Sequence, residues 1–230
     1  GPENNVCDSL NIQKRNEVLI GWSKDGFHWN RENKKPFLPV SEDFHAWNAG
    51  NVQSTAGNPL IVGDSLYFYV SGRYNSKPKH DSNFATGLAM LRRDGFVSMR
   101  AGRKEGYVEV KTQISANGNY LFVNADVKGT LAVEVLNDNG QSIEGFTKRD
   151  CILMKKSDKT KQMISWKKHP DLTSLIGKTV RLRFYLKQAD IYTFWISAWQ
   201  TGESGGYTGG GGPGLSDKGI DTPIDKLKNN

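Results

Sequence analysis

The chain has 230 residues, a formal net charge of +7, 37% hydrophobic and 10% aromatic residues. This length allows one or two domains, and the ordinary charge content excludes a wholly disordered chain. No apolar run is long enough to cross a bilayer, so we expect no membrane partner.

A hairpin is the first predicted element. The stretch "GWSKDGFHW" (Gly21–Trp29) places an Asp-Gly turn between two short apolar runs, which is a strong hairpin signal. We expect the carboxylate of Asp25 to cap backbone N–H groups in this turn.

Short strands are predicted next, with Gly-Asp and Asp-Gly turns between them. No segment before Gly102 has the 3.6-residue apolar period of a helix. Such closely spaced strands are typical of antiparallel four-stranded units. The predicted strands are Asn51–Thr55, Pro59–Val62 and Ser65–Arg73, and the stretch Phe84–Met99 follows with a second Asp-Gly turn at Asp94-Gly95.

Longer strands with clean two-residue alternation are predicted from residue 102 to residue 200, which indicates half-buried strands. About eight strands in this stretch favour a two-layer β-sandwich. Asn124 and Asp126 are predicted to point outward. The inward-pointing residues are predicted to be Leu121, Val123, Ala125, Val127, Leu131, Val133, Val135, Val180, Leu182, Phe184 and Leu186.

Turns divide this second region. They are predicted at Asn137–Gly140, at Ile176-Gly177 and at Ala189-Asp190. The stretch "DLTSLIG" (Asp171–Gly177) predicts a single helical turn that Asp171 caps.

The last segment, residues 201–230, is rich in glycine. It lacks the Gly-Lys-Ser/Thr sequence of a phosphate-binding loop. We therefore interpret it as a surface tail and not as a nucleotide site.

The positive charge is spread along the chain and does not form one basic patch. Its densest region, Lys148–Lys168, also contains Asp150 and Asp158, and Trp166 is its one aromatic residue. This composition predicts a solvated loop or an edge strand that lysines protect, and we expect no nucleic-acid partner.

Two cysteines, Cys7 and Cys151, lie far apart in the sequence. A disulfide is possible, but two separate thiols are the favoured interpretation. The chain has no CxxC and no His/Cys cluster, so we expect neither a metal site nor a cofactor.

The ordered set of motifs resembles a known family. "IGWSKDGFHW", "WNAGNVQS", "GDSLYFYVSGR" and "TGLAMLRRDGFVSM" resemble the last part of the five-bladed β-propeller of glycoside hydrolase families 32 and 43. The stretches around "LFVNADVKGTLAVEVLNDNG" and "TVRLRFYLKQADIYTFWIS" are similar to the β-sandwich that follows this propeller in family 32. The resemblance covers about residues 15–200.

The resemblance implies an all-β chain in three parts. Residues 1–101 would form a partial β-propeller, its last one to two blades. Residues 102–200 would form a jelly-roll-like β-sandwich, and residues 201–230 the glycine-rich tail. The chain would then be the C-terminal portion of a hydrolase that acts on glycosidic bonds of oligosaccharides or polysaccharides, in a secreted or periplasmic location.

The catalytic carboxylates of such propellers lie on the first three blades, so none is carried over to this chain. Glycoside hydrolysis needs two opposed carboxyl groups. The acidic residues present are better explained by turns and solvated loops: Asp25, Glu42, Asp43, Asp64 and Asp94.

A carbohydrate site is predicted in and near "HAWNAGNVQS" (His45–Ser54). Sugars present hydroxyl groups and apolar C–H faces, so they need amide or guanidinium partners beside an aromatic platform. Trp47 could stack on a sugar, or it could pack within a blade. The other candidates are Asn48, Asn51, Gln53, Arg73 and His80; Arg73 could instead form an inter-blade ion pair, and His80 could be an ordinary surface histidine.

Three functions remain open on the sequence alone. The chain is part of a glycoside hydrolase, a lectin-like carbohydrate-binding module, or a structural module that braces a propeller. In each case we expect the chain to lack a complete catalytic set, and carbohydrate is the expected partner of the first two.

Overall fold

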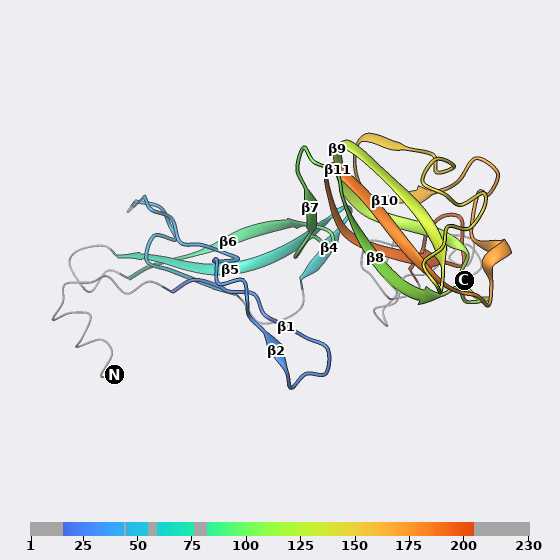
Figure 1. The fold of residues 1–230 in the computed structure, drawn as a ribbon. Coiled ribbons are helices and arrows are strands. Elements are labelled where there is room, and N and C mark those ends of the chain that lie inside the picture. Colours follow the sequence, from blue (N-terminus) through green and yellow to red (C-terminus); the bar gives the residue numbers. More distant parts are fainter. Residues whose placement is uncertain (1–15, 44, 55–58, 76–81, 205–230) are drawn as a thin grey trace. The chain divides into compact units, whose positions relative to one another are not determined.

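The computed structural model describes residues 16–43, 45–54, 59–75 and 82–204. Over this part the protein is all-β, and its one helical element is the 3-10 turn η1, Thr173–Leu175 (Figure 1). The described residues divide into two compact units. The first contains those up to Val62 together with Leu66–Met90, and the second contains Gly63–Ser65 together with those from Leu91 onward.

The predicted hairpin is present in the first unit. Strands β1 (Trp22–Ser23) and β2 (Trp29–Asn30) pair antiparallel, with Trp22 opposite Asn30. Gly26 has φ +79°, the left-handed conformation that glycine adopts without strain. The Asp-Gly pair therefore sits in the turn as predicted.

A four-stranded sheet forms the rest of the first unit. It contains β3 (Asn51–Ser54), β4 (Leu60–Val62), β5 (Ser65–Asn75) and β6 (Ser82–Arg92), and β5 pairs with each of the other three. Figure 1 shows β5 and β6 running side by side. The core on this sheet is small: Val40, Val52 and Val70 are buried, and partly buried Val18, Leu38, Phe68 and Ala89 pack against them.

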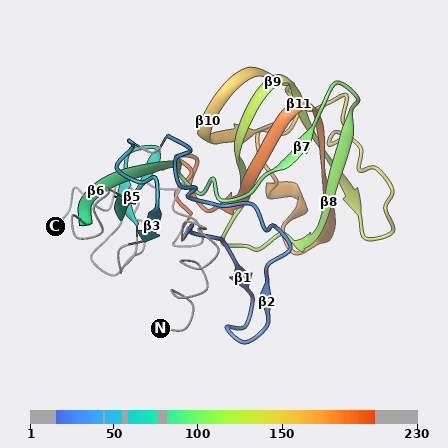
Figure 2. The same ribbon diagram turned by 90° about the vertical axis from the view of Figure 1, so that its left-hand side faces the viewer.

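The second unit is built on one five-stranded sheet that curls into a half-barrel (Figure 2). β9 (Tyr120–Asn137) lies between β10 (Met154–Ile164) and β11 (Thr179–Ser197). The other edge of β11 pairs with β8 (Gly106–Gln113) and with β7 (Met99–Ala101).

The two longest strands bend where the sequence predicted a turn. At Ala189-Asp190 the chain does not turn. It continues as β11, with register shifts on both sides of this pair, between Lys187 and Ala189 and between Ile191 and Thr193. Each extra residue reverses the side-chain alternation, so the core face of β11 passes from even to odd positions and back. The predicted turn at Ala189-Asp190 is therefore wrong, because these bulges bend one strand instead of ending it.

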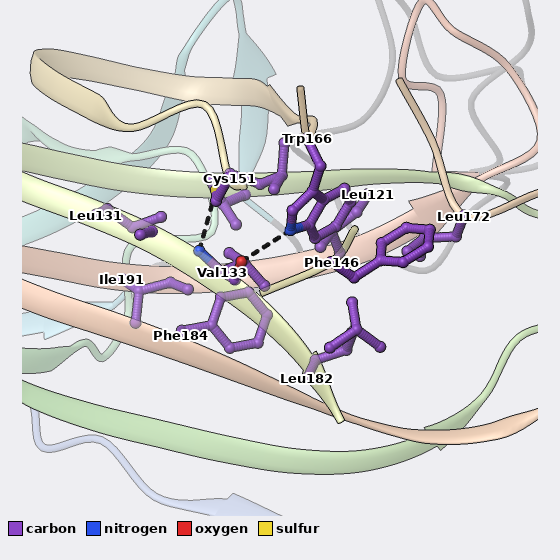
Figure 3. Packing of buried hydrophobic residues seen from close by; sticks show 14 of the residues in the cluster. Leu121, Leu131, Val133, Phe146, Cys151, Trp166, Leu172, Leu182, Phe184 and Ile191 are labelled. Carbon is purple, nitrogen blue, oxygen red and sulfur yellow. Dashed lines mark hydrogen bonds between the residues drawn. The ribbon is translucent and has the colours of Figure 1, made fainter. Parts of the chain in front are cut away.

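The core of the second unit lies inside the curled sheet (Figure 3). All eleven residues predicted to point inward are buried. Trp166 and Cys151 add to this core from the chain on either side of β10, and both form hydrogen bonds with the backbone of Val133 in β9. The indole N–H of Trp166 donates to the Val133 carbonyl at 3.0 Å, and the Val133 N–H donates to Cys151 Sγ at 3.2 Å.

Cys151 is a free, buried thiol, and burial raises its pKa. This agrees with the favoured interpretation of separate thiols; Cys7 lies outside the described residues. The lysine-rich region also follows its prediction, because β10 is an edge strand whose Lys155, Lys156 and Lys159 are exposed.

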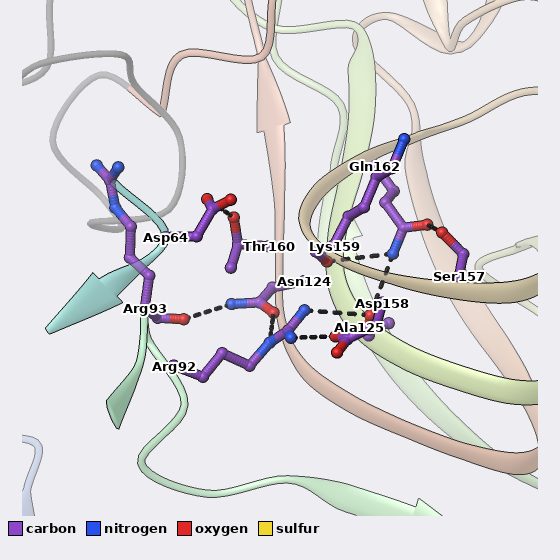
Figure 4. A network of polar contacts seen from close by, with 10 residues as sticks. All are labelled: Asp64, Arg92, Arg93, Asn124, Ala125, Ser157, Asp158, Lys159, Thr160 and Gln162. Carbon is purple, nitrogen blue, oxygen red and sulfur yellow. Dashed lines mark hydrogen bonds and ion pairs between the residues drawn. The ribbon is translucent and has the colours of Figure 1, made fainter. Parts of the chain in front are cut away.

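Asn124 is fully buried, contrary to the outward position predicted for it. Its amide is enclosed by a polar network on the outer face of β9 and β10 (Figure 4). Asn124 Nδ2 donates to the Arg93 carbonyl at 2.6 Å, and Arg92 Nε donates to Asn124 Oδ1 at 2.6 Å. Arg92 also pairs with Asp158. Alternation predicted the correct face, but it could not predict that residues 92–93 cover that face.

The helical turn predicted at residues 171–177 is present as η1, but its N-cap residue is Leu172 and not Asp171. Asp171 lies one residue earlier, and its Oδ1 accepts a hydrogen bond of 2.8 Å from the Thr173 N–H. Gly177 follows with φ +80°, and the loop at Asn137–Gly140 ends with Gly140 at φ +80°. Both positions use glycine for its left-handed conformation.

Candidate functional site

The indole of Trp47 packs against two glycines of neighbouring strands, and this packing position is called its seat below. A Cβ atom at either Gly72 of β5 or Gly87 of β6 would overlap the six-membered ring of the indole. The ring therefore lies directly against the backbone of the sheet, where any larger residue would displace it. Even so, Trp47 is 38% exposed, so it is both packed and accessible from outside.

The predicted polar partners lie on the other face of this sheet. Asn51 is opposite Arg73, and Gln53 is opposite Ser71, while Val52 and Gly72 pair between them. Because side chains alternate along a strand, Asn51, Gln53 and Arg73 share the face away from Trp47. The register thus brings Asn51, Gln53 and Arg73 together on one face of the sheet and places them on the opposite face from Trp47.

Arg73 has an aromatic partner on this second face. Its guanidinium lies 4.6 Å from the ring centre of Phe84 on β6, which is a cation–π distance. The large apolar residues here are exposed: Tyr69, Phe84, Leu88 and Met90. This face therefore presents an accessible aromatic and aliphatic surface beside a cation and two amide side chains.

Asn48 and His80 complete the predicted set. The Asn48 amide makes one long contact, 3.5 Å from its Nδ2 to the Pro39 carbonyl, and Asn48 is half-buried. His80 lies outside the described residues. The binding roles of Trp47, Asn48, Asn51, Gln53, Arg73 and His80 stay predictions.

Asp25 has the structural role that the sequence predicted. Its Oδ1 accepts hydrogen bonds from the N–H groups of Phe27 (2.9 Å) and His28 (2.8 Å), and its Oδ2 lies 2.5 Å from His28 Nδ1. These contacts with His28, with those to Phe27 and Ser23, hold the pKa of the Asp25 carboxyl well below its usual range. A carboxylate that stays ionised is a poor general acid.

Three other acidic residues lie in turns: Asp43, Asp64 and Asp94. Asp43 Oδ1 accepts the His45 N–H at 2.9 Å within a turn. Asp64, in the Gly-Asp turn, accepts a hydrogen bond from the Thr160 hydroxyl. Asp94 has φ +54°, as a turn residue can. The contacts of Asp43 and Asp64 hold local structure, and they do not form an acid–base pair.

An open depression of about 500 Å³ lies on the hairpin, and Trp22, Asp25, His28 and Trp29 line it. Trp29 is 61% exposed here, since its strand lies in a two-stranded hairpin. Its indole N–H donates to the Gly26 carbonyl at 3.2 Å.

Gly72 and Gly87 are residues that the sequence reasoning missed. The signal was present, since glycine inside a strand often marks the close approach of another group.

In the part of the chain that the structure describes, no group of three or more His, Cys, Asp or Glu side chains could hold a metal. Over the same residues, no helix has the length and apolar content of a membrane span.

Compared with models of protein families, with curated proteins and with solved structures, the chain matches none.

Proposed function

We propose that this chain is the C-terminal portion of a family 32-like glycoside hydrolase. In this proposal residues 1–101 supply the last one to two propeller blades, and residues 102–200 supply the trailing jelly-roll-like β-sandwich. The support comes from the motif order in the sequence and from two features of the fold. These are the Asp-Gly hairpin that Asp25 caps and the antiparallel sheet of β3, β5 and β6.

The proposed partner is a carbohydrate, and the observation that carries this is the seat of Trp47. An indole held against the backbone of Gly72 and Gly87, with 38% of the residue exposed, has an orientation fixed before any ligand arrives. Such a rigid aromatic face suits stacking against the C–H face of a sugar ring. It also lowers the entropy lost on binding, since the side chain is already ordered.

The exposed second face of this sheet supports the propeller part of the proposal. A soluble monomer rarely exposes a large contiguous apolar patch, and Tyr69, Phe84, Leu88 and Met90 are all exposed there. In a propeller each sheet packs between neighbouring sheets, so such a face would be covered. Arg73, beside Phe84, would then lie between two blades.

A lectin-like or structural module is the second candidate. The capping and turn contacts of Asp25, Asp43 and Asp64 agree with either candidate, because neither places a catalytic carboxylate in this chain. In both candidates the chain contributes binding surface. They differ in whether a pair of opposed carboxylates elsewhere in the protein cleaves the bound glycan.

Activity of the full-length gene product distinguishes the two candidates. We would assay it, beside this chain alone, on fructans and on plant and algal oligosaccharides. The hydrolase proposal expects cleavage of at least one substrate by the full-length product and none by this chain. If the full-length product binds a glycan but cleaves no member of the panel, the lectin-like candidate replaces the hydrolase.

A further inference from the structure

A cavity of about 520 Å³ lies in the second unit, at the C-terminal end of β11. Its walls come from the loop between β8 and β9 and from the chain that leaves β11. The polar and aromatic residues that line it include Asn117, Asn119, Trp199, Glu203 and Ser204. This volume is in the usual range of small-molecule sites.

The wall that carries Glu203 is held rigidly. The Trp195 indole N–H donates to the Gly202 carbonyl at 3.0 Å, and the Ser197 hydroxyl donates to the Glu203 carbonyl at 2.6 Å. Trp195 in turn stacks on Phe122, with ring centres 5.6 Å apart. Two buried side chains of β11 thus fix two successive carbonyl groups, and the position of Glu203 follows from them.

The carboxylate of Glu203 is buried but only half satisfied. Glu203 has no exposed surface, and its Oε2 accepts a hydrogen bond from the Thr201 hydroxyl. Its Oε1 is buried without a hydrogen-bond partner. A buried acceptor left in this state destabilises the protein, and a ligand that donates a hydrogen bond to Oε1 would remove that penalty.

We propose that this cavity is a non-catalytic binding site for a neutral saccharide. The Glu203 side chain is enclosed in this structure, so it would turn toward the cavity to accept a hydrogen bond from a ring hydroxyl at Oε1, and the ring would lie near the indole of Trp199. The Asn119 Nδ2 donates to Thr173 Oγ1 at 2.7 Å, which orients its amide oxygen as an acceptor. Hydroxyl groups both donate and accept, so they match a set of amides, hydroxyls and one carboxylate.

A metal ion fits this cavity less well. Ca²⁺ takes six to eight oxygen ligands and Mg²⁺ six, whereas Glu203 is the one carboxylate among the lining residues. The proposed site is separate from Trp47, which belongs to the other unit. It requires no cleavage, so it does not depend on the hydrolase proposal.

Ligand-observed NMR on the full chain tests the site, with glucose, fructose, galactose, mannose, xylose and sucrose as probes. At least one sugar should show saturation transfer, with an affinity that titration calorimetry then measures. Glu203→Gln keeps the shape of the side chain and removes its charge. It should weaken that affinity about tenfold or more, as expected for the loss of a charge-assisted hydrogen bond.

Two further variants keep the test decisive. Asn117 is exposed, so Asn117→Ala should fold normally, and it should also weaken binding. Glu144 is exposed and lies outside the cavity, so Glu144→Gln should leave the affinity unchanged. Binding that persists in both Glu203→Gln and Asn117→Ala, or no binding of any probe to the parent chain, would overturn the proposal.

Discussion

Small residues determine where Trp47 lies in the first unit. Trp47 can rest on the sheet because Gly72 and Gly87 leave room for its ring. The pattern recurs in the second unit, where Gly202 leaves room for Phe122. At both places, the glycine allows an aromatic ring to contact the backbone; the ring of Phe122 is buried there, whereas Trp47 stays 38% exposed.

Replacing Trp47 by Ala should therefore affect stability and binding together. Because the indole is partly exposed, we expect a loss of about 2–3 kcal/mol in the free energy of unfolding, at or below the low end for a buried Trp→Ala change. Urea denaturation measures this loss, and calorimetry on the same variant should show weaker binding of the glycan identified for the protein. Trp29→Ala removes a more exposed indole from the hairpin and should change the free energy by less than about 1 kcal/mol.

The two variants separate the roles of Trp47. A large loss of stability with unchanged glycan affinity would assign it to packing alone. That result would remove the main support for a carbohydrate site in the first unit, while leaving the cavity at Glu203 unaffected.

The sequence could predict the candidate binding residues, but it could not predict on which face of the sheet Trp47 lies. Trp47 among amides and small residues indicated a binding stretch, and the alternation in β3 and β5 placed Asn51, Gln53 and Arg73. The face on which Trp47 lies depends on a loop that crosses to the sheet, and loop paths leave no periodic signal. Glu203 escaped notice for another reason: its glycine-rich surroundings indicated a tail, whereas Gly202, Glu203 and Ser204 are buried.

At the scale of the element, bulges turn two long strands into a curled sheet. β9 and β11 pair along most of their length, and both bend near Gly129 and Gln188, where Gln188 has φ +46°. The alternating pattern of each half was visible in the sequence, so the core residues could be predicted. The continuity of the strands could not, because a bulge breaks the pattern just as a turn does.

Gly129→Ala tests this bend. A Cβ at position 129 would overlap the carbonyl oxygen of Lys187 across the strand pair. Since backbone cannot move aside as a flexible side chain can, we expect a loss of about 2 kcal/mol or more in the free energy of unfolding. Gly106→Ala is the matched control in β8, where the nearest atom is the Ala101 Cβ at 4.0 Å. Equal urea midpoints for the two variants would contradict a constrained bend.

An ion-pair ladder on the outer face of β8 and β11 gives the sheet a pH dependence. Hydrogen bonds from Arg183 and then Arg181 lower the pKa of Glu109, although burial opposes this. The shortest contact of Glu109 with each arginine is 2.7 Å to Arg183 Nη2 and 3.1 Å to Arg181 Nη1. Because the folded pKa lies below the unfolded value of 4.5, the pair stabilises the fold above that pH. The contribution is lost as pH falls through the folded pKa.

Glu109→Gln should show this dependence directly. At pH 7 we expect it to unfold about 1 kcal/mol more easily than the parent chain, because the pair is partly exposed and solvent screens it. The difference should shrink as the pH falls below about 4.5 and approach zero in acid. Glu144→Gln, at an exposed position, should match the parent chain at every pH. A difference for Glu109→Gln that stays constant from pH 7 to pH 3 would exclude the ion pair as its cause.

For the whole molecule, the buried side chains are divided unequally between the two units. The second unit has a continuous core that β9, β10 and β11 share with Trp166, Phe146, Leu172 and Leu175. Among the described residues of the first unit, the hydrophobic cluster consists of buried Val40, Val52 and Val70 with a few partly buried neighbours. Since burial of apolar surface is the main stabilising contribution to folding, the second unit should be much the more stable.

Hydrogen exchange should make this difference visible along the whole chain. Amides in core strands exchange only through global opening, whereas those over a small core exchange through local opening of lower free energy. We expect the slowest exchange in β9 and β11, because β9 is paired on both sides and β11 pairs with β7, β8 and β9. Amides of β3 and β5 should exchange faster by about a hundredfold or more, which corresponds to a difference of at least ~2.7 kcal/mol in opening free energy.

Mass spectrometry of peptides from β5 and β9, repeated at rising urea below the unfolding midpoint, measures both rates. In the stable unit the slow amides should approach a common opening free energy, while β5 should remain nearly insensitive to urea, as local fluctuations are. If β5 instead exchanged as slowly as β9 and with the same urea dependence, the two units would unfold together. The small valine core would then have to draw its stability from contacts beyond its own unit.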